Sequence, residues 1–209
     1  VPWHQGHRPA RFPRPRIVVT AMTRQLWAAT RALLVLTVLL GVAYPLGMTA
    51  LALAMPDRAT GSLVMIDGRP AGSVLLGQAT VEPQWFRARP SVSDYSGETS
   101  GGSNWGPSAA ELSADLAARA ADLRAVNPLA PAGPIPADAL TTSASGLDPH
   151  ISPAYAAWQA PRVAAARGMT VEQVQRLIDA NMTSGELGFL GADRVNVTTL
   201  NAALATLGR

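Results

Sequence analysis

The stretch ALLVLTVLLGVAYPLGMTALALAMP, residues 32–56, contains 25 consecutive residues without a charged side chain. As an α-helix it would extend about 37 Å at about 1.5 Å per residue, which exceeds the roughly 30 Å of a bilayer's hydrocarbon core. A helix that is apolar on all sides must be buried in protein or lie in lipid. The stretch therefore predicts a transmembrane helix that separates a short N-terminal part from a long C-terminal part.

Charged residues on the two sides of this stretch predict its orientation. Residues 1–31 carry six Arg and no acidic residue, and Arg24 and Arg31 directly precede the apolar stretch. All 14 acidic residues lie from Asp57 onward with 11 Arg, so the long part has a formal charge of −3. Basic flanks stay in the cytoplasm. We therefore expect residues 22–31 to be a cytoplasmic flank, 32–56 a transmembrane helix and 57–209 an extracytoplasmic domain.

The main alternative for the apolar stretch is a cleaved signal peptide, since Ala52-Leu53-Ala54 has the A-x-A form of a cleavage site. The apolar run is longer than the roughly 7–15 residues of a signal-peptide core, which favours an uncleaved anchor. Residues 1–21 are rich in Pro and Arg and lack periodicity, so we expect a disordered extension there. Met22 is a plausible translation start within this region.

Composition excludes several classes of protein. The formal charge of +3 and pI of about 10.2 are typical of nucleic-acid binders. However, the positive excess lies on the N-terminal flank rather than on a folded surface that could meet phosphates, so no nucleic-acid partner is expected. The chain has no Cys, which rules out disulfides and zinc–thiolate sites.

The first half of the long part predicts one hairpin, one loop and one helix. Apolar runs at 62–66 and 73–76 surround Asp67-Gly68-Arg69-Pro70, a pattern typical of a β-hairpin. Residues 91–107 are rich in Ser and Gly and predict a loop. Residues 108–126 have the apolar spacing of an amphipathic helix, which the proline-rich stretch 128–136 ends.

The second half predicts three helices and a small hairpin. Ser152 followed by Pro153 is a helix start, and Thr170 with Gln173 forms a capping box that starts another helix. Residues 187–190 and 194–197 are expected to pair around Gly191-Ala192-Asp193, and 198–207 to form the last helix. The mixed order of strands and helices predicts an α+β fold.

The stretch SGGSNWGPS, residues 100–108, is the strongest candidate for anion binding. Gly-rich loops can direct backbone N–H groups at a phosphate, here from Ser100, Gly101, Gly102, Ser103 and Asn104. A P-loop also requires a Lys, and the chain contains none. A structural or docking loop is therefore the favoured interpretation, and a nucleotide-binding or other ligand-binding module is an alternative.

The stretch ASGLDPHISP, residues 144–153, places Asp148 two residues before His150. A stable metal site needs three or four ligands, and no other His or Cys lies in this part of the chain. A membrane-anchored extracytoplasmic hydrolase using Ser143 or Ser145 is a second alternative, although the candidates share one short loop without a nucleophile elbow. We favour a turn in which Asp148 and Ser152 cap the following helix.

The order of eight short motifs resembles the C-subunit family of Kdp-type potassium-transporting ATPases. Each motif is weak by itself, whereas eight in order at family-like spacing are specific. The motifs are GSL at 61–63, GSVLLGQ at 72–78, WFRARPS at 85–91, SGGSNWGPS at 100–108, SASGLDPHISP at 143–153, PRVAAARG at 161–168, LGFLG at 187–191 and RVNVTTLN at 194–201. The resemblance runs from about Met22 to Leu207.

This resemblance implies an accessory subunit without catalytic residues or a firmly bound cofactor. The implied partners are a channel-like potassium subunit, a P-type ATPase subunit and a very small single-helix subunit, all in the cell membrane. The family is credited with a role in assembly and with raising the ATP affinity of the ATPase subunit, so contact of ATP with residues 100–104 is an expectation from the resemblance alone. The family-signature residues are candidates for subunit contacts: Arg89, Pro90, Ser91, Gly146, Asp148, Pro149, His150, Ser152, Pro153, Arg162, Asn196 and Asn201.

Overall fold

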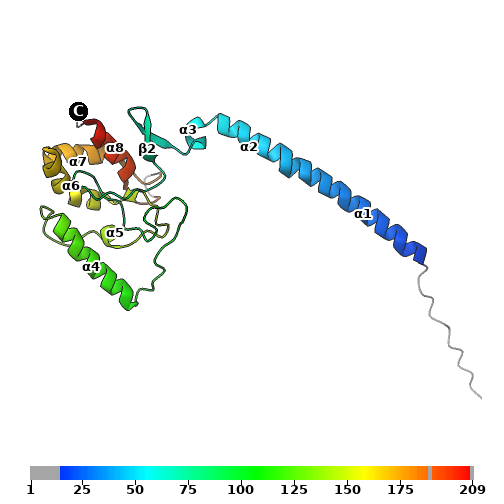
Figure 1. Ribbon diagram of the computed structural model, residues 1–209, viewed down its shortest axis with the longest axis horizontal. Helices are drawn as coiled ribbons and strands as arrows, with labels where there is room; N and C mark the ends of the chain where they lie inside the picture. The colour runs from blue at the N-terminus through cyan, green and yellow to red at the C-terminus, as the bar shows by residue number, and fades with distance from the viewer. Residues whose placement is uncertain (1–14, 188–189, 208–209) are drawn as a thin grey trace, which may run out of the picture. The chain divides into compact units, whose positions relative to one another are not determined.

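A computed structural model describes residues 15–187 and 190–207, with the backbone alone for 15–19. The chain divides into two compact units, Val1–Ala59 and Thr60–Arg209, which are described separately (Figure 1). The expected disordered extension lies outside the described residues up to residue 14.

The first unit is one nearly continuous helix. Helix α1 (Pro15–Val38) passes through a π-helical turn, η1 (Leu39–Ala43), into α2 (Tyr44–Leu53), and a short α3 follows (Pro56–Ala59). The π-turn ends at Ala43, two residues before Pro45, which has no N–H to donate to the preceding turn and whose ring crowds a carbonyl of that turn. A local widening of the helix relieves this conflict without ending the helix.

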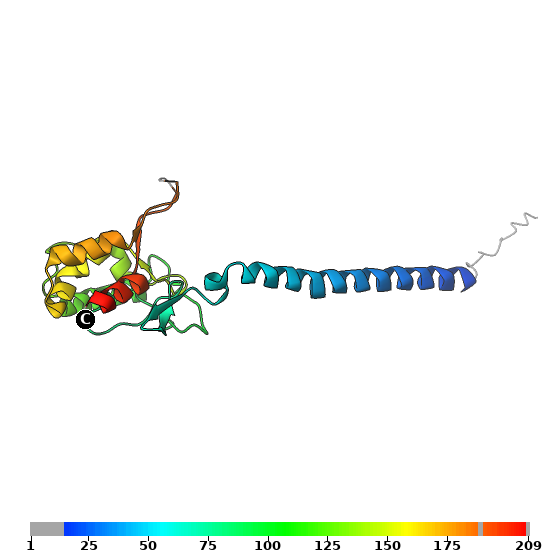
Figure 2. The same ribbon diagram turned by 90° about the horizontal axis from the view of Figure 1, so that it is seen from above.

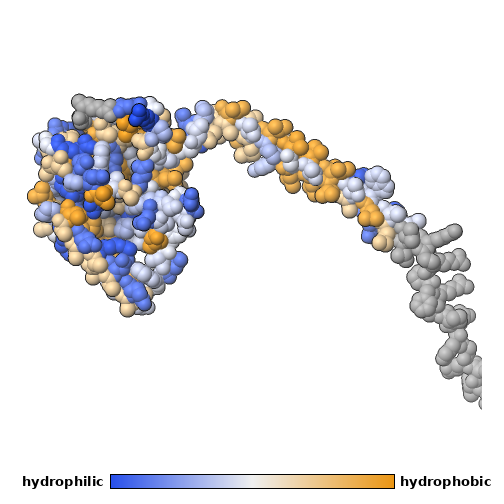
Figure 3. Space-filling model, viewed as in Figure 1, coloured by the Kyte–Doolittle hydropathy of each residue, from blue (hydrophilic) through white to orange (hydrophobic). Residues whose placement is uncertain are grey.

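The apolar part of this helix fits the expected transmembrane segment. Thr20–Leu53 is a helix of 34 residues, long and apolar enough to cross a membrane, and its apolar window is 0% buried within the described chain (Figure 3). The expectation of an irregular segment is wrong for residues 15–21, because α1 already begins at Pro15. Proline is tolerated in the first turn of a helix, and the apolar residues after it continue the helical pattern.

The second unit begins with the expected hairpin, formed by β1 (Leu63–Ile66) and β2 (Arg69–Ser73). Asp67 and Gly68 make its two-residue turn with positive φ angles of 52° and 72°, a conformation suited to Asp-Gly. The second strand lies closer to the turn than the predicted run at 73–76, because this tight turn pairs Arg69 directly with Ile66.

A three-stranded antiparallel sheet has the order β3-β5-β4 and consists of β3 (His150–Ile151), β5 (Arg194–Asn196) and β4 (Met182–Thr183). The predicted pairing of 187–190 with 194–197 is therefore wrong for the described residues, since β5 pairs with Met182–Thr183 instead, and residues 188–189 lie outside the described part of the chain. Pairing on both sides buries Val195 completely, whereas Leu187 and Leu190 are exposed. Figure 2 shows the chain on either side of residues 188–189 extending away from the body of the domain.

The helices of the second unit largely match the sequence prediction. They are α4 (Ala110–Val126), the unpredicted single turn α5 (Ala137–Leu140), α6 (Pro153–Arg167), α7 (Val171–Ala180) and α8 (Val197–Leu207). Ser152 Oγ accepts from the Tyr155 N–H at 3.0 Å, and Thr170 with Gln173 forms the expected capping box. The fold of this unit is α+β.

The core lies where α6, α7 and α8 meet β5, and two residues of an extended segment, Phe86 and Ala88, also belong to it. Phe86 is 0% exposed. The other large side chains that are fully buried are Tyr155, Gln159, Val163, Val174, Ile178, Val195, Leu200 and Leu204. The extended segment that holds Phe86 therefore runs directly beside the helical core, and it brings the WFRARPS motif to the later motifs.

Candidate functional site

Residues 143–153, here called the signature turn, are held by a glycine that cannot be replaced without strain. Gly146 has φ +68°, and its carbonyl accepts a hydrogen bond of 2.7 Å from Ser91 Oγ. A Cβ at Gly146 would lie 2.4 Å from Ser93 Oγ and 2.9 Å from the Gly101 carbonyl oxygen. The glycine is therefore required both for its backbone conformation and for the close approach of two other loops.

Asp148 joins the signature turn to the WFRARPS motif. Its carboxylate lies 3.4 Å from Arg89 Nη1, and it accepts the His150 backbone N–H at 2.9 Å. Arg89 also donates to the Thr142 carbonyl at 3.2 Å. One guanidinium thus binds Asp148 within the turn and Thr142, the residue just before it.

The prediction that Asp148 caps α6 is wrong. Asp138, in α5, accepts from both the N–H and the hydroxyl of Ser152 at 2.7 and 2.9 Å. Ser152 then caps the helix, and Pro153 is its first residue. The cap was correctly assigned to Ser152, but the carboxylate that supports it comes from a turn of helix that the sequence did not predict.

His150 packs between an aspartate and an asparagine. Its Nδ1 lies 3.4 Å from Asp148 Oδ1, its Nε2 lies 3.5 Å from Asn196 Nδ2, and its side chain is 37% exposed. Within the described part of the chain, neither Ser143 nor Ser145 hydrogen-bonds the imidazole, so the geometry offers no nucleophile–base pair. The described residues also contain no group of three or more His, Asp or Glu side chains suited to a metal ion.

Residues 100–104, here called the SGGSN loop, pack against the signature turn. Gly101 N–H and Ser100 Oγ both donate to the Ser145 carbonyl, at 2.9 and 3.1 Å. A Cβ at Gly102 would lie 3.2 Å from the Ala144 carbonyl oxygen. The glycines of this loop therefore permit a close approach of two backbones, and the Gly101 N–H that a phosphate would need is already engaged.

Of the other polar residues of the loop, one makes a weak contact beside the signature turn and one is exposed. Ser103 Oγ lies 3.5 Å from Thr142 Oγ1, at the limit of a hydrogen bond. Asn104 is exposed and has a positive φ of 55°.

Three guanidinium groups bind the backbone carbonyls of residues 81–85, an arrangement here called the guanidinium clamp. Arg87 donates to the Val81 carbonyl, Arg162 to those of Pro83 and Trp85, and Arg167 to that of Gln84. Arg167 also lies over the Trp85 ring, with its guanidinium carbon 4.4 Å from the ring centroid.

Arg162 is the buried centre of this clamp, with only 5% of its surface exposed. Its remaining N–H groups donate to Asn127 Oδ1 at 2.6 Å and to Gln159 Oε1 at 2.8 Å. Burial lowers the pKa of Arg162 to about 10, so the side chain stays charged at neutral pH. Its neutral oxygen partners join the end of α4, the segment before Phe86 and α6.

The two signature asparagines also bind backbone. Asn201 pairs with both the N–H and the carbonyl of Phe86, at 2.8 and 2.9 Å, as a neighbouring strand would. Asn196 accepts from the Thr199 N–H at the start of α8 and donates to the Val74 carbonyl. Sequence reasoning selected both as family-signature residues but did not foresee this backbone role.

The remaining signature residues lie at the turn and in an adjoining cavity. Pro149 is buried, and its carbonyl accepts from the Val197 N–H at 2.8 Å. Pro90 lines a cavity beside α4, and its carbonyl accepts from the Ser143 N–H at 3.2 Å.

Tyr95 is a structural residue that the sequence analysis missed. Its hydroxyl donates to the Arg89 carbonyl, and its ring lies 3.0 Å from where a Cβ of Gly77 would be. The one signal for it in the sequence is a lone aromatic residue within a stretch of Ser, Gly and acidic residues.

The burial of Tyr95 predicts a loss of stability in alkali. Burial, with smaller contributions from Asp94 and Asp148, raises the pKa of Tyr95 to about 12 from 10. The unfolded chain therefore loses this proton first, and the stabilisation present below pH 10 is lost as pH rises toward 12. We expect urea midpoints to fall above pH 10, and Tyr95→Phe to reduce this slope by up to about 1.4 kcal/mol per pH unit. An unchanged slope in Tyr95→Phe would contradict the assignment.

Comparison with known proteins identifies the family. The family described as K+-transporting ATPase, c chain, matches residues 26–206. The chain belongs to the KdpC family. A potassium-transporting ATPase KdpC subunit from Caulobacter vibrioides is 52% identical over 172 residues, which cover 80% of this chain and 86% of that protein. A KdpC subunit from Cereibacter sphaeroides is 45% identical over 188 residues, covering 90% of this chain and 100% of its own length.

The KdpC match confirms the resemblance that the eight motifs indicated. It begins at Leu26 within α1 and ends at Thr206 within α8, so it includes the apolar helix as well as the folded unit. KdpC subunits are separate chains from the catalytic chain of the ATPase that their name describes. The signature residues described above are thus features of a KdpC fold, in which most of them bind one another or the backbone.

Proposed function

We propose that this chain is a non-catalytic, membrane-anchored subunit of a potassium-transporting ATPase complex and contributes to its assembly. One observation carries the proposal: a helix of 34 residues whose apolar window is 0% buried precedes a folded domain whose signature side chains are engaged with each other or with the backbone. The helix needs lipid or partner helices to cover it, and the domain offers a fixed surface.

The contacts of the signature residues support a structural role. Arg89, Asp148 and Asn201 use their polar atoms to hold loops in place, and His150 lies against Asp148 without a nucleophile beside it. A surface built in this way can be recognised by other subunits without reacting chemically. The contacts of residues 100–104 favour the same role for that loop, and ATP contact stays a prediction from the family resemblance.

For the partners, we propose a channel-like potassium subunit, a P-type ATPase subunit and a small single-helix subunit. The domain would lie outside the cell membrane on the channel-like subunit, near the ion entrance. The excess of Arg before the apolar helix supports this orientation. The formal charge of −3 after residue 56 would weakly concentrate cations there, an effect that should fade with ionic strength.

Co-purification tests subunit membership. A tag on this chain should recover the channel-like and ATPase subunits from detergent extracts. We expect Leu40→Arg to reduce recovery strongly, because a charge at the centre of a membrane helix costs about 2.5–3.5 kcal/mol. Leu40→Ala is the matched control and should retain the complex. A chain that purifies alone, and whose deletion leaves growth at micromolar potassium unchanged, would refute the proposal.

Cysteine labelling tests the orientation. The chain has no native Cys, so one introduced Cys reports a single place. Gly97→Cys suits the domain, because Gly97 is exposed and nothing lies within 4 Å of its Cβ position. A membrane-impermeant maleimide should label Gly97→Cys in whole cells and should label Gln25→Cys only after lysis. The opposite pattern would place the domain in the cytoplasm.

A further inference from the structure

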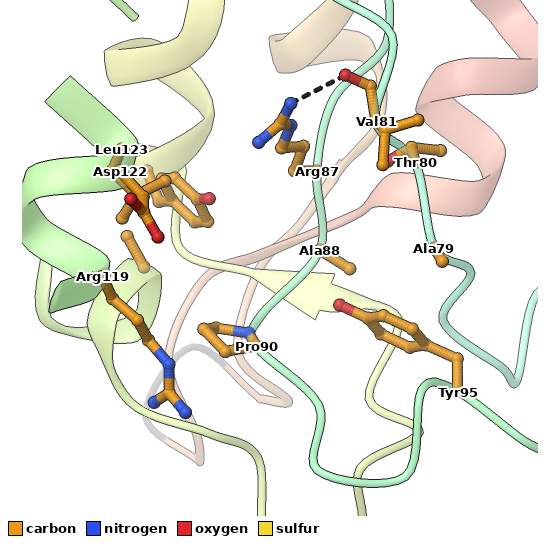
Figure 4. Close-up of a pocket in the computed structure, with 12 residues that line it drawn as sticks. Ala79, Thr80, Val81, Arg87, Ala88, Pro90, Tyr95, Arg119, Asp122 and Leu123 are labelled. Atoms are coloured by element: carbon orange, nitrogen blue, oxygen red, sulfur yellow. Dashed lines mark hydrogen bonds between the residues drawn. The ribbon is translucent and has the colours of Figure 1, made fainter. Parts of the chain in front are cut away.

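A cavity of about 260 Å³ lies between α4 and the extended segment 79–90 (Figure 4). Its walls are mainly apolar, and the residues that form them are Ala79, Val81, Ala88, Pro90, Leu123 and Ala139. The volume is below the roughly 300–1,000 Å³ typical of pockets for drug-sized ligands. The cavity therefore suits a short group rather than a nucleotide.

Two hydrogen-bond donors at this cavity have no partner among the described residues. Tyr155 is 1% exposed and lines the cavity, yet its hydroxyl makes no hydrogen bond there. Arg87 Nε is buried and also lacks a partner, while another nitrogen of the same guanidinium donates to the Val81 carbonyl at 2.7 Å (Figure 4). Buried polar groups normally find partners, so the buried Arg87 Nε, with the Tyr155 hydroxyl at the same cavity, indicates a missing acceptor.

The charges around these donors favour an anionic acceptor. Neither Arg87 nor Arg162 forms an ion pair with a carboxylate in the described part of the chain. Burial raises the pKa of Tyr155, and both arginines lie near enough for their positive charge to offset part of that increase. Arg119 at the same cavity is already paired with Asp115.

One acidic residue opposes this preference. Asp122 also lines the cavity, but it is exposed, so solvent screens its charge more than that of the buried groups.

We propose that this cavity binds a carboxylate on a short apolar stem, which accepts hydrogen bonds from Arg87 Nε and the Tyr155 hydroxyl. The apolar walls would cover the stem. The carboxylate belongs either to a small organic acid or to an Asp or Glu side chain of another subunit. The carboxylate site and membership of the ATPase complex can be tested separately, because co-purification can succeed whether or not the cavity binds a carboxylate.

Propionate is the probe, and ligand-observed NMR on the full chain in detergent measures its binding. We expect saturable binding, and binding at least tenfold weaker for the uncharged analogue propionamide. Arg87→Gln and Tyr155→Phe should each weaken propionate binding, by about tenfold or more for the arginine. Arg124→Gln, an exposed arginine of α4 that does not line this cavity, is the matched control and should bind normally. Far-ultraviolet circular dichroism checks that each variant is folded.

The assembled complex distinguishes the two sources of the carboxylate. Binding to both the free subunit and the complex supports a small organic acid. Binding to the free subunit alone, with loss of complex in Arg87→Gln, supports an acidic side chain of a partner. Absence of saturable binding to the free subunit, or equal binding by Arg87→Gln, Tyr155→Phe and the unmodified chain, overturns the proposal.

Discussion

Replacement of Arg162 by Met is expected to destabilise the domain by about 3–5 kcal/mol, a large part of the roughly 5–15 kcal/mol that stabilises a typical domain. The guanidinium binds four oxygens, those of Asn127, Pro83, Trp85 and Gln159. Methionine fills a similar volume but leaves Asn127 Oδ1 and the Trp85 carbonyl without this donor, at about 1–3 kcal/mol for each buried acceptor, whereas Gln159 Oε1 keeps the Arg87 N–H. Removal of a buried charge returns part of that loss, so the total is less than the sum.

Urea unfolding of the full chain in detergent, followed by tryptophan emission, measures this change. Arg176→Met on α7 is the matched control, because Arg176 is exposed, and it should shift stability by no more than about 0.5 kcal/mol. Arg162→Lys should be intermediate, since one ammonium cannot reach the positions of a planar guanidinium. Equal stabilities for the variants at 162 and 176 would show that the clamp does not hold the domain together.

Gly146→Ala is expected to cost about 2–4 kcal/mol and to weaken recovery of the complex. Part of the loss, about 1–2 kcal/mol, comes from placing a Cβ in the left-handed region at φ +68°. The rest comes from steric conflict between the new Cβ and two atoms. These are the Gly101 carbonyl oxygen, 2.9 Å away, and Ser93 Oγ, which is held by a hydrogen bond to another serine of its own loop. Two loops would have to move apart, and the proposed surface would change shape.

Gly168→Ala separates the cost of the left-handed backbone conformation from the cost of the close packing. Gly168 ends α6 with φ +64°, but nothing lies within 4 Å of its Cβ position. It should therefore lose only the conformational part, about 1–2 kcal/mol, and retain the complex. If Gly146→Ala and Gly168→Ala behave alike in both urea unfolding and co-purification, the close packing at Gly146 has no role in assembly.

Local sequence patterns predicted most of the fold because each pattern stabilises its element through contacts between neighbouring residues. Ser152 with Pro153, and Thr170 with Gln173, start helices that the structure contains, since capping depends only on near neighbours. The pairing of β5 with Met182–Thr183 was missed because short strands carry little periodicity and their partners depend on what the core must bury. The start of α1 at Pro15 was missed because the Pro- and Arg-rich composition indicated disorder, although a helix accepts proline in its first turn.

The sequence predicted which residues belong to the candidate site but not which contacts those residues make. Motif order selected Arg89, Asp148, Arg162 and Asn201, yet no spacing in the sequence shows that they bind residues 35 to 115 positions away. The assignment of a cap to Asp148 failed for the same reason, because its partner Arg89 comes from a distant loop. Such long-range contacts are decided by packing rather than by neighbouring residues.

The guanidinium clamp is expected to hold in acid. Its acceptors are carbonyl oxygens of residues 81–85 and side-chain amides, none of which takes up a proton in the acidic pH range. Domains joined by carboxylate pairs lose those links as the medium acidifies. Here carboxylate contacts such as Arg89–Asp148 and Asp138–Ser152 would weaken in acid, whereas the clamp would keep the helical core attached to its extended segment.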